Sequence, residues 1–342
     1  MSNGKVNIGL VGVANHGQTI LRAIKGCESL ALWSCFDINS EAAANVSRTT
    51  GCKHASDYDE LINDDRLEAV ALVTPNFLHL EQCVKALERG KHIFVEKPFA
   101  LNVNEAKKIN EVAQKSSRIL QVGHNTRKRE VFREAKRLIN SGELGEIVSV
   151  YANMSFDFGL TKNVPEWKKQ KDKCPLLPMT QLGIHFIDTL EYLIGPIKSV
   201  SCVQRSVVLK DKDGKAVTDS VAATLTFANG IIGTIQSDYV SPYTYEIVVF
   251  GSKAKATCAD SEILLERWSG GKIERVIVSA TEKFDGESYF AEIAEFAECI
   301  LTNNSPEVDG QVGLYNLAVV EAMLRSAETR QMIDIDEVLQ DL

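Results

Sequence analysis

The sequence predicts an α/β protein in two parts: a doubly wound parallel sheet, followed by an α+β domain with a large open, mostly antiparallel sheet. Its 342 residues suffice for about two domains. Short apolar runs alternate with helical patterns in the first third, and strands with period-2 alternation dominate after residue 200. We expect one domain over residues 1–124 and a second over 125–342, whose C-terminal helix can pack back on the first.

Strands that are apolar throughout and separated by helices are typical of a parallel sheet covered on both faces. The runs that predict strands are Val6–Val13, Leu30–Phe36, Glu68–Val73, His92–Val95 and Arg118–Val122. The intervening helical patterns are Thr19–Ile24, Glu41–Thr50, His79–Arg89 and Asn104–Lys115. This alternation predicts the doubly wound first domain.

The pattern changes after about residue 125. A helix closed by Ser141-Gly142 and a Pro-rich loop precede a second helix, Thr180–Ile194, which Gly195-Pro196 ends. Asn229-Gly230 predicts a type I′ hairpin between alternating strands. Further strands (Glu246–Phe250, Ile263–Glu266 and Ile273–Val278) and two helices (Tyr289–Ile300 and Tyr315–Ser326) complete the chain. These hairpins argue against a closed (β/α)₈ barrel, the rival fold, because a barrel needs a helix after every strand.

Composition excludes several classes of function. The formal net charge of -8, without a basic stripe, argues against binding nucleic acid or an anionic membrane. Eight cysteines are scattered without a zinc-type cluster, which favours a reducing compartment. The first apolar run is too short for a membrane span, and no signal peptide is recognisable. We expect a cytoplasmic protein.

The loop after the first strand suggests a dinucleotide site. It reads Gly12-Val13-Ala14-Asn15-His16-Gly17, an imperfect G-x-G-x-x-G in which Ala14 replaces the second glycine. Asp37 ends the second strand, where a carboxylate can accept hydrogen bonds from the adenosine ribose. A carboxylate there repels a 2′-phosphate and no Arg follows directly, so we expect NAD rather than NADP. The alternatives are an incidental strand–turn–helix corner and an Asp that caps the next helix.

Two more motifs follow the predicted strands Glu68–Val73 and His92–Val95, at the edge where open α/β sheets bind ligands. They are Thr74-Pro75-Asn76, with His79 close behind, and Glu96-Lys97-Pro98. Lys97 directly follows a run predicted to be buried, so an ordinary surface ion pair with Glu96 is the weaker interpretation. His16, His79 and His124 lie far apart in sequence and lack a ligand pattern such as H-E-x-x-H, so we predict no metal.

These motifs resemble the glucose–fructose oxidoreductase and inositol dehydrogenase (Gfo/Idh/MocA) family over nearly the whole chain. The matching segments are Gly9-Leu10-Val11-Gly12, Asp37, Thr74-Pro75-Asn76 with His79, Glu96-Lys97-Pro98, Gly123-His124-Asn125, Ser141-Gly142-Glu143-Leu144-Gly145, and Gly183-Ile184-His185-Phe186-Ile187-Asp188.

The resemblance implies an N-terminal Rossmann domain and NAD(P)-dependent hydride transfer to or from a hydroxyl carbon of a sugar, sugar derivative or cyclitol. It implies that Lys97 is the catalytic lysine, that Glu96 lies near the nicotinamide ribose, and that Lys97–Pro98 is cis. We also expect the cofactor to contact residues 12–17, Asp37, residues 74–76, His79 and Asn125.

The helix that carries His185 is the second candidate site. At about 100° per residue, Gln181, His185 and Asp188 share one face. Alone, His185 is more readily a satisfied core histidine; with the resemblance it becomes the acid/base partner of Lys97 or a hydrogen-bond donor, and Asp188 would orient it. Many relatives carry Asp at position 181, and Gln cannot act as a base. Arg127 and Trp167 can contact substrate, although an ordinary structural role fits each equally well.

The sequence leaves two other functions open: an NAD-dependent glycoside hydrolase, which also occurs in this family, and a non-catalytic NAD-binding sensor. The second domain should leave one sheet face without helices, and some of that face is apolar. We therefore expect a homodimer or homotetramer formed through the C-terminal sheet.

Overall fold

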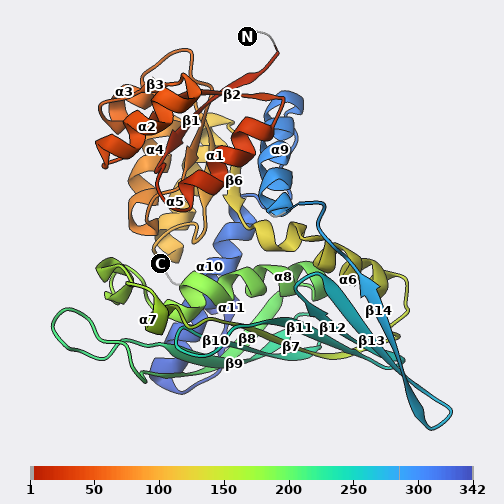
Figure 1. Cartoon of the computed structure of the whole chain (residues 1–342). Helices are drawn as coiled ribbons and strands as arrows, with labels where there is room; N and C mark the ends of the chain where they lie inside the picture. Colours follow the sequence, from red (N-terminus) through yellow and green to blue (C-terminus); the bar gives the residue numbers. More distant parts are fainter. Residues whose placement is uncertain (1–3, 285, 341–342) are drawn as a thin grey trace. The chain divides into compact units, whose positions relative to one another are not determined.

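The computed structural model describes residues 4–284 and 286–340, which fold as two compact units (Figure 1). One unit contains Met1–Asn125 and Phe284–Tyr315, and the other contains Thr126–Lys283 and Asn316–Leu342. The chain therefore passes between the units three times. Each unit has its own sheet, a six-stranded one in the first and a nine-stranded one in the second.

The first unit is built on a parallel sheet with the order β3-β2-β1-β4-β5-β6, that of a Rossmann fold. Its strands are β1 (Val6–Val11), β2 (Leu30–Phe36), β3 (Lys53–His54), β4 (Ala69–Leu72), β5 (His92–Glu96) and β6 (Leu120–Gly123). Its helices are α1 (Gly17–Gly26), α2 (Ser40–Thr50), α3 (Tyr58–Ile62), α4 (His79–Glu88), α5 (Val103–Ser116) and α9 (Glu287–Thr302). The predicted doubly wound fold is confirmed.

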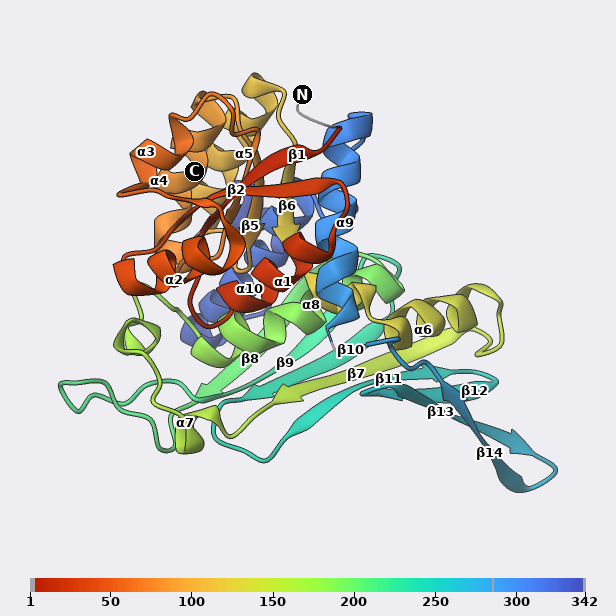
Figure 2. The ribbon, with the colours of Figure 1, turned by 45° about the horizontal axis from the view of Figure 1, so that its top comes forward.

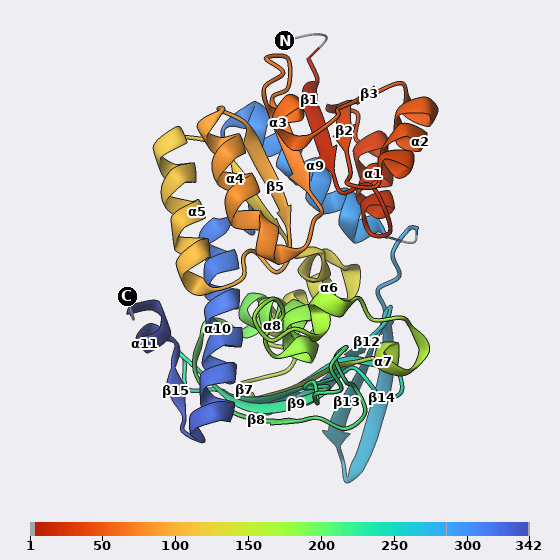
Figure 3. The same cartoon turned by 90° about the vertical axis from the view of Figure 1, so that its left-hand side faces the viewer.

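Both faces of this sheet are covered, as the apolar strands predicted (Figures 2 and 3). Ile8 and Leu10 of β1 belong to a buried cluster that includes Ile20 and Ile24 of α1. Phe296 of α9 belongs to the same cluster, although it lies far from β1 and α1 in the sequence. Helices α4 and α5 pack together on the opposite face. Both faces of the sheet are therefore buried. The polar loops lie at the edge formed by the carboxyl ends of its strands.

The second unit is built on the sheet β14-β13-β12-β11-β7-β10-β9-β8-β15, in which only the described pair β7–β10 is parallel. Its strands are β7 (Ile147–Ser155), β8 (Ile197–Arg205), β9 (Ser220–Phe227), β10 (Ile232–Asp238), β11 (Thr244–Gly251), β12 (Ala254–Ala259), β13 (Glu262–Ser269), β14 (Lys272–Ser279) and β15 (Ile333–Asp334). The mostly antiparallel sheet of the prediction is confirmed.

Helices α6 (Glu130–Asn140) and α8 (Ile184–Ile194) lie on one face of this sheet (Figure 3). The segment between β7 and α8 holds α7 (Phe158–Thr161) and a 3-10 turn, Glu166–Lys169. After α9 the chain continues into α10 (Gly310–Thr329), which the boundary between the units divides, and then into α11 (Ile335–Gln340). No helix among the described residues is long and apolar enough to cross a membrane.

Two local predictions were wrong. The turn after β9 is not type I′, because Gly230 has a φ of 86° while Asn229 does not adopt positive φ. The predicted helix Thr180–Ile194 begins as a π-helical turn, Met179–Gly183, before α8. A π turn is wound less tightly than an α-helix, so the angles calculated from Gln181 to His185 do not hold.

Candidate functional site

The loop between β1 and α1 forms the first part of the candidate site. Gly12 has a φ of 84°, and a Cβ there would lie 2.4 Å from the carbonyl oxygen of Val73. A Cβ on Gly17 would lie 2.0 Å from the carbonyl oxygen of Gly12. Both positions therefore require glycine. Ala14, by contrast, is exposed and meets no such restriction.

This loop leads into the N-terminus of α1, whose first turn has no acidic residue and no side-chain cap. Asn15 adopts a left-handed conformation, with a φ of 46°. Helix N-termini with available N–H groups bind phosphates, because the groups point outward and the helix dipole favours negative charge. This loop is therefore the candidate pyrophosphate site, which stays a prediction, because the N–H groups of Gly17, Gln18 and Thr19 donate to loop carbonyl oxygens in this structure.

Asp37 lies immediately after β2 and contacts the same loop. Its Oδ2 accepts hydrogen bonds from the backbone N–H groups of Val13 at 2.8 Å and Ala14 at 3.2 Å. Its Oδ1 accepts one from Asn39, and it is the Asn39 side chain that caps α2. The carboxylate thus fixes the loop in shape, and the alternative in which Asp37 itself caps α2 is wrong.

Thr74-Pro75-Asn76 follows β4, and His79 joins this loop to the segment after Lys97. The His79 ring is fully buried, with Nε2 2.9 Å from the Thr74 carbonyl oxygen and Nδ1 3.1 Å from that of Pro98. Burial lowers its pKa. Thr74 Oγ1 donates to Gln82 at 2.5 Å, and Asn76 is buried. His79 is placed to hold two loops together, with its ring away from the surface.

Glu96 ends β5 and Lys97 follows it directly, and the Lys97–Pro98 bond is cis, as predicted. Glu96 Oε1 lies 2.9 Å from Nε2 of His16, and Oε2 accepts a hydrogen bond from the backbone N–H of Lys97. Burial raises the pKa of Glu96, but the attraction of His16 and Lys97 outweighs it and leaves the pKa lower than usual. Glu96 is therefore a buried carboxylate that ties the fingerprint loop to the lysine motif.

The register of the sheet explains how Glu96 fits. Gly123 of β6 lies opposite Glu96, and a Cβ there would approach the Glu96 carboxyl carbon to 3.2 Å. Asn125, just beyond, donates through Nδ2 to the hydroxyl of Ser288 at 2.9 Å. Glu96, Gly123, Asn125, Asp37 and residues 74–76 all lie at or just beyond the carboxyl ends of parallel strands, so one edge of the sheet carries them.

In the second unit, α8 carries His185 and Asp188. His185 is partly exposed, and its Nδ1 lies 3.1 Å from Oγ1 of Thr126. Asp188 is fully buried and accepts hydrogen bonds from Arg127 at 2.6 and 2.7 Å and from Asn316 at 2.8 Å. The structure thus places Asp188 and Arg127 in a buried ion pair, the ordinary structural role that the sequence left open for Arg127.

Gln181 and Trp167 occupy different surroundings. Gln181 lies in the π turn, nearly buried, with Nε2 3.5 Å from Sγ of Cys174. Trp167 is partly exposed in the 3-10 turn, and Nζ of Lys168 lies 5.5 Å from its ring centroid. Burial lowers the pKa of Lys168. This lysine is therefore poorly solvated for a residue in a loop segment.

Three residues of the two sites escaped sequence reasoning: Tyr289, Thr126 and Asn316. The Tyr289 ring packs edge-on against His16 at 5.4 Å. Thr126 and Asn316 contact His185 and Asp188 respectively. No motif marks any of them, because each contact joins positions far apart in the sequence. Among the described residues, no group of three or more His, Cys, Asp or Glu could hold a metal ion.

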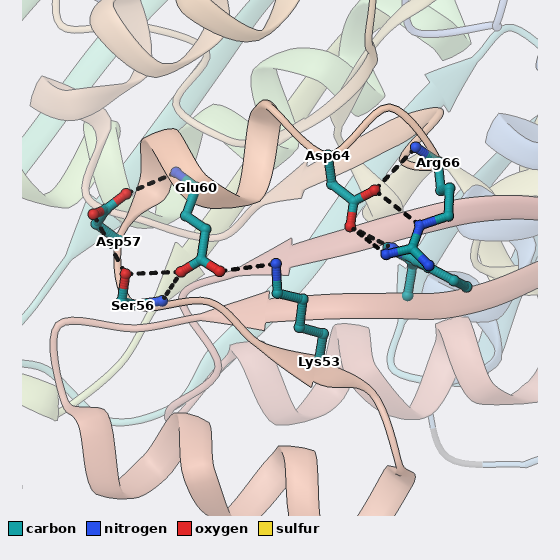
Figure 4. Close-up of polar contacts among 7 residues, drawn as sticks. Lys53, Ser56, Asp57, Glu60, Asp64 and Arg66 are labelled. Carbon is teal, nitrogen blue, oxygen red and sulfur yellow. Dashed lines mark hydrogen bonds and ion pairs between the residues drawn. The ribbon is translucent and has the colours of Figure 1, made fainter.

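A further polar cluster, around α3, has a structural role (Figure 4). Asp57 caps α3 by accepting from the N–H of Glu60, and Glu60 accepts from Ser56 and pairs with Lys53 at 2.8 Å. The hydrogen bond to Lys53 and those from Ser56 lower the pKa of Glu60 to about 2. Since these charges are already paired, the cluster supports the start of α3.

Comparisons with known proteins agree with this geometry. Two family models match: "Oxidoreductase family, NAD-binding Rossmann fold" over residues 6–124 and "Oxidoreductase family, C-terminal alpha/beta domain" over residues 136–335. The myo-inositol 2-dehydrogenase of Thermotoga maritima is 23% identical, with 98% of this chain and all of that protein covered. The scyllo-inositol 2-dehydrogenase (NAD(+)) of Bacillus subtilis is 27% identical, with 94% and 92% covered.

Solved structures show the same fold. A levoglucosan dehydrogenase in complex with NADH and levoglucosan superimposes with a TM-score of 0.89 at 22% identity, over 97% of this chain and 99% of that one. The carboxyl-edge loops described above occupy the domain that the NAD-binding model matches. The chain therefore belongs to the Gfo/Idh/MocA oxidoreductase family, with its NAD-binding Rossmann domain and its C-terminal α/β domain.

Proposed function

We propose that this protein is an NAD-dependent dehydrogenase that transfers a hydride between the nicotinamide and a hydroxyl carbon of a sugar, sugar derivative or cyclitol. One observation carries the proposal: a single edge of the Rossmann sheet carries the Gly12–Gly17 loop, Asp37 and Glu96-Lys97. A dinucleotide laid along that edge would have its adenosine near β2 and its nicotinamide toward β5.

The residues present fit NAD. The Gly12–Gly17 loop and the start of α1 would receive the pyrophosphate. Asp37 would receive the adenosine ribose through the lone pair that the hydrogen bonds from Val13, Ala14 and Asn39 leave available. The negative charge of Asp37 would repel a 2′-phosphate, which favours NAD over NADP. Glu96 would lie near the nicotinamide ribose, and His79 would act indirectly, by holding the Thr74 and Pro98 loops.

The substrate class rests on the relatives. Relatives named for an activity include two inositol dehydrogenases, a levoglucosan dehydrogenase and a glucose-6-phosphate 3-dehydrogenase of Bacillus subtilis, the last 31% identical over 219 residues. Each acts on a polyhydroxylated ring. A ring of this class is therefore our proposed substrate, and Trp167 and Gln181 are proposed to contact it.

Lys97 is proposed to move the hydroxyl proton, and His185 to bind the reacting oxygen. The bound cofactor supplies the hydride acceptor or donor. A lysine amine at the end of β5 can take the proton as the carbonyl forms, and it can return that proton in the reverse direction. Glu96 is engaged with His16 and with the backbone of Lys97, so its task is to hold the lysine motif and not to exchange protons.

A panel of inositols, sugars, sugar phosphates and nucleotide sugars tests this function. Thermal shift with NAD present finds binders, since a ligand at 100 times its Kd adds about 2.7 kcal/mol to stability. NADH absorbance then measures turnover. A dehydrogenase accumulates NADH, whereas a glycoside hydrolase consumes substrate without net NADH. Tight NAD binding without turnover on any panel member would contradict the proposal and favour a sensor.

A further inference from the structure

His16 is the one residue of the loop Gly12–Gly17 whose side chain can carry a positive charge. It directly precedes α1, and its imidazole Nε2 lies 2.9 Å from Oε1 of Glu96. The two side chains differ in exposure, with 41% of His16 and 6% of Glu96 accessible to solvent. His16 thus joins the candidate pyrophosphate loop to the buried carboxylate beside Lys97.

The Glu96 carboxylate decides how the ring of His16 is protonated. Burial raises the pKa of Glu96, but the charges of His16 and Lys97 outweigh burial, and the pKa lies below its usual range. Glu96 is therefore ionised at neutral pH, and an ionised carboxylate only accepts hydrogen bonds. Nε2 of His16 donates this bond and carries a proton whether the ring is charged or neutral. The charge of the ring depends on Nδ1 alone.

Nδ1 is the atom of His16 that remains for a ligand. Within the residues that the structure describes, Nδ1 has no hydrogen-bond partner, and the ring packs edge-on against Tyr289 of α9, with centroids 5.4 Å apart. The titratable and charged groups around the loop are Glu96 and Lys97 at the end of β5, the phenol of Tyr289, and Asp37 after β2. The first turn of α1 adds no acidic residue.

The backbone of this loop is a weaker anion site than its sequence pattern suggests. The N–H groups of Gly17, Gln18 and Thr19 already donate to carbonyl oxygens of the loop. A pyrophosphate would bring two negative charges close to the negative charge of Glu96. A proton on Nδ1 of His16 would supply a charged donor to the phosphate and place a positive charge between the two anions.

We propose that His16 binds the pyrophosphate of NAD as an imidazolium, with Nε2–H donating to Glu96 and Nδ1–H donating to a phosphate oxygen, so that cofactor binding takes up a proton. This rests on the proposed function. The proton passes from the buffer to Nδ1 as the pyrophosphate arrives, and it returns to the buffer when the pyrophosphate leaves. Because the anion favours the charged ring, affinity is highest at low pH and falls as pH rises.

Calorimetric titration of the full-length protein with ADP-ribose tests the proposal. ADP-ribose has the pyrophosphate but lacks the nicotinamide, whose positive charge would also act on Lys97. Binding heats measured in two buffers of different ionisation enthalpy give the number of protons taken up at each pH. Adenosine, which has no phosphate, should bind without proton uptake.

The expected size follows from the charges. A neighbouring opposite charge shifts a titration by about one to three pH units, and the low end of that range makes ADP-ribose binding about tenfold weaker at pH 9 than at pH 6. The same shift gives a maximum uptake of about half a proton between these pH values.

Two variants of His16 separate its charge from its hydrogen bond. His16→Gln keeps a donor for Glu96 but cannot be protonated, so it should bind ADP-ribose about tenfold more weakly than wild type at pH 6, equally at pH 9, and without proton uptake. His16→Arg is charged at every pH, so it should bind as tightly at pH 9 as at pH 6, also without uptake.

His92→Gln is the matched control. His92 begins β5, at the end of the strand away from Glu96, and burial together with Arg118 lowers the pKa of His92 to about 4. It is therefore neutral from pH 6 to 9. His92→Gln should keep the wild-type proton uptake.

ADP-ribose binding without proton uptake in the wild type would overturn the proposal and leave the dehydrogenase function standing, as would uptake that persists in His16→Gln. If His16→Gln does not fold, His16→Arg decides, because its uptake must also be zero. NAD binding with uptake but without turnover across the panel would contradict the dehydrogenase function alone. Failure of both NAD and ADP-ribose to bind would refute both.

Discussion

Arg127 holds Asp188 through two hydrogen bonds of 2.6 and 2.7 Å, and no part of the Asp188 side chain is exposed to solvent. Asn316 adds a third bond to the same carboxylate. An aspartate so enclosed has its lone pairs committed to the protein. We therefore expect Asp188 to stabilise the fold around α8, although its place in the sequence suggests a catalytic helper.

Asp188→Ala should destabilise the protein by about 3–5 kcal/mol, because it leaves the Arg127 charge buried without its partner. Denaturant unfolding with and without Arg127→Met in the same chain measures this cost. The double variant should recover part of the lost stability. If the Asp188→Ala protein keeps wild-type stability but loses turnover, Asp188 has a catalytic role and the prediction is wrong.

Lys97→Ala should reduce turnover by roughly 10²- to 10⁴-fold, the usual span for a general acid–base group. The fold should survive, since Lys97 is partly exposed. Steady-state kinetics with circular dichroism as a folding check measure both effects. Lys108→Ala, which changes a lysine on the exposed side of α5, is the control. Near-wild-type turnover in Lys97→Ala would refute the assignment.

Asp37→Ala should weaken NAD binding by about 10- to 100-fold, because hydrogen bonds to a charged group contribute roughly 1.5–3 kcal/mol. Binding of NADP should weaken less or improve, since the repulsive charge is gone. Titrations of both cofactors followed by fluorescence give the ratio of their Kd values. A ratio unchanged from wild type would show that Asp37 does not set cofactor preference.

Glu191 gives a prediction about pH. Burial and the neighbouring Asp188 raise the pKa of Glu191 to about 8, against the opposing effects of the Ile197 N–H and Arg127. Between the ordinary pKa of about 4.3 and about 8, the folded state holds a proton that the unfolded state has released, so stability falls as pH rises. The slope from this group approaches about 1.4 kcal/mol per pH unit.

Glu191→Gln removes that slope. Its stability relative to wild type should therefore be greater at pH 8 than at pH 5, as measured by denaturant unfolding at both values. Glu134→Gln is a matched control, because the hydrogen bond from Arg137 lowers the pKa of Glu134 instead. Equal differences at the two pH values for Glu191→Gln would contradict the prediction.

We expect the face of the second sheet away from α6 and α8 to form the interface between copies of the chain in a homo-oligomer. The strand registers place Ile232, Phe250, Trp268 and Ile277 on one face, where they are 60%, 38%, 73% and 64% exposed. Ile277→Glu with Trp268→Arg should shift the protein toward a smaller species in light scattering at micromolar concentration. A monomer in the wild type would contradict the homo-oligomer.

The sequence predicted the parallel sheet and most of its edge residues well, because local signals fix both. Apolar runs indicated the strands. Because the carboxyl ends of parallel strands meet at one edge of the sheet, the residues that follow each strand lie together there. The sequence therefore placed Glu96 and Asp37 at this edge. It did not predict that they would pair with His16 and Val13, since hydrogen bonds across loops leave no period in the sequence.

Other errors have similar physical causes. The π turn before α8 has the composition of an α-helix, so periodicity could not reveal the change in winding. Thr126 and Asn316 carry no motif, yet they decide how His185 and Asp188 are held. Asn229-Gly230 adopts another turn because only its glycine takes positive φ.

The return of residues 284–315 to the first unit has a practical consequence for dividing the protein. Residues 1–125 alone would lack α9, whose Ile293, Phe296 and Ala297 complete the core around β1 and α1. Stripped of that helix, the cofactor-binding half would expose an apolar surface to water and would tend to aggregate. The NAD-binding half is encoded in two stretches separated by more than 150 residues of the other unit, and no single cut can release it.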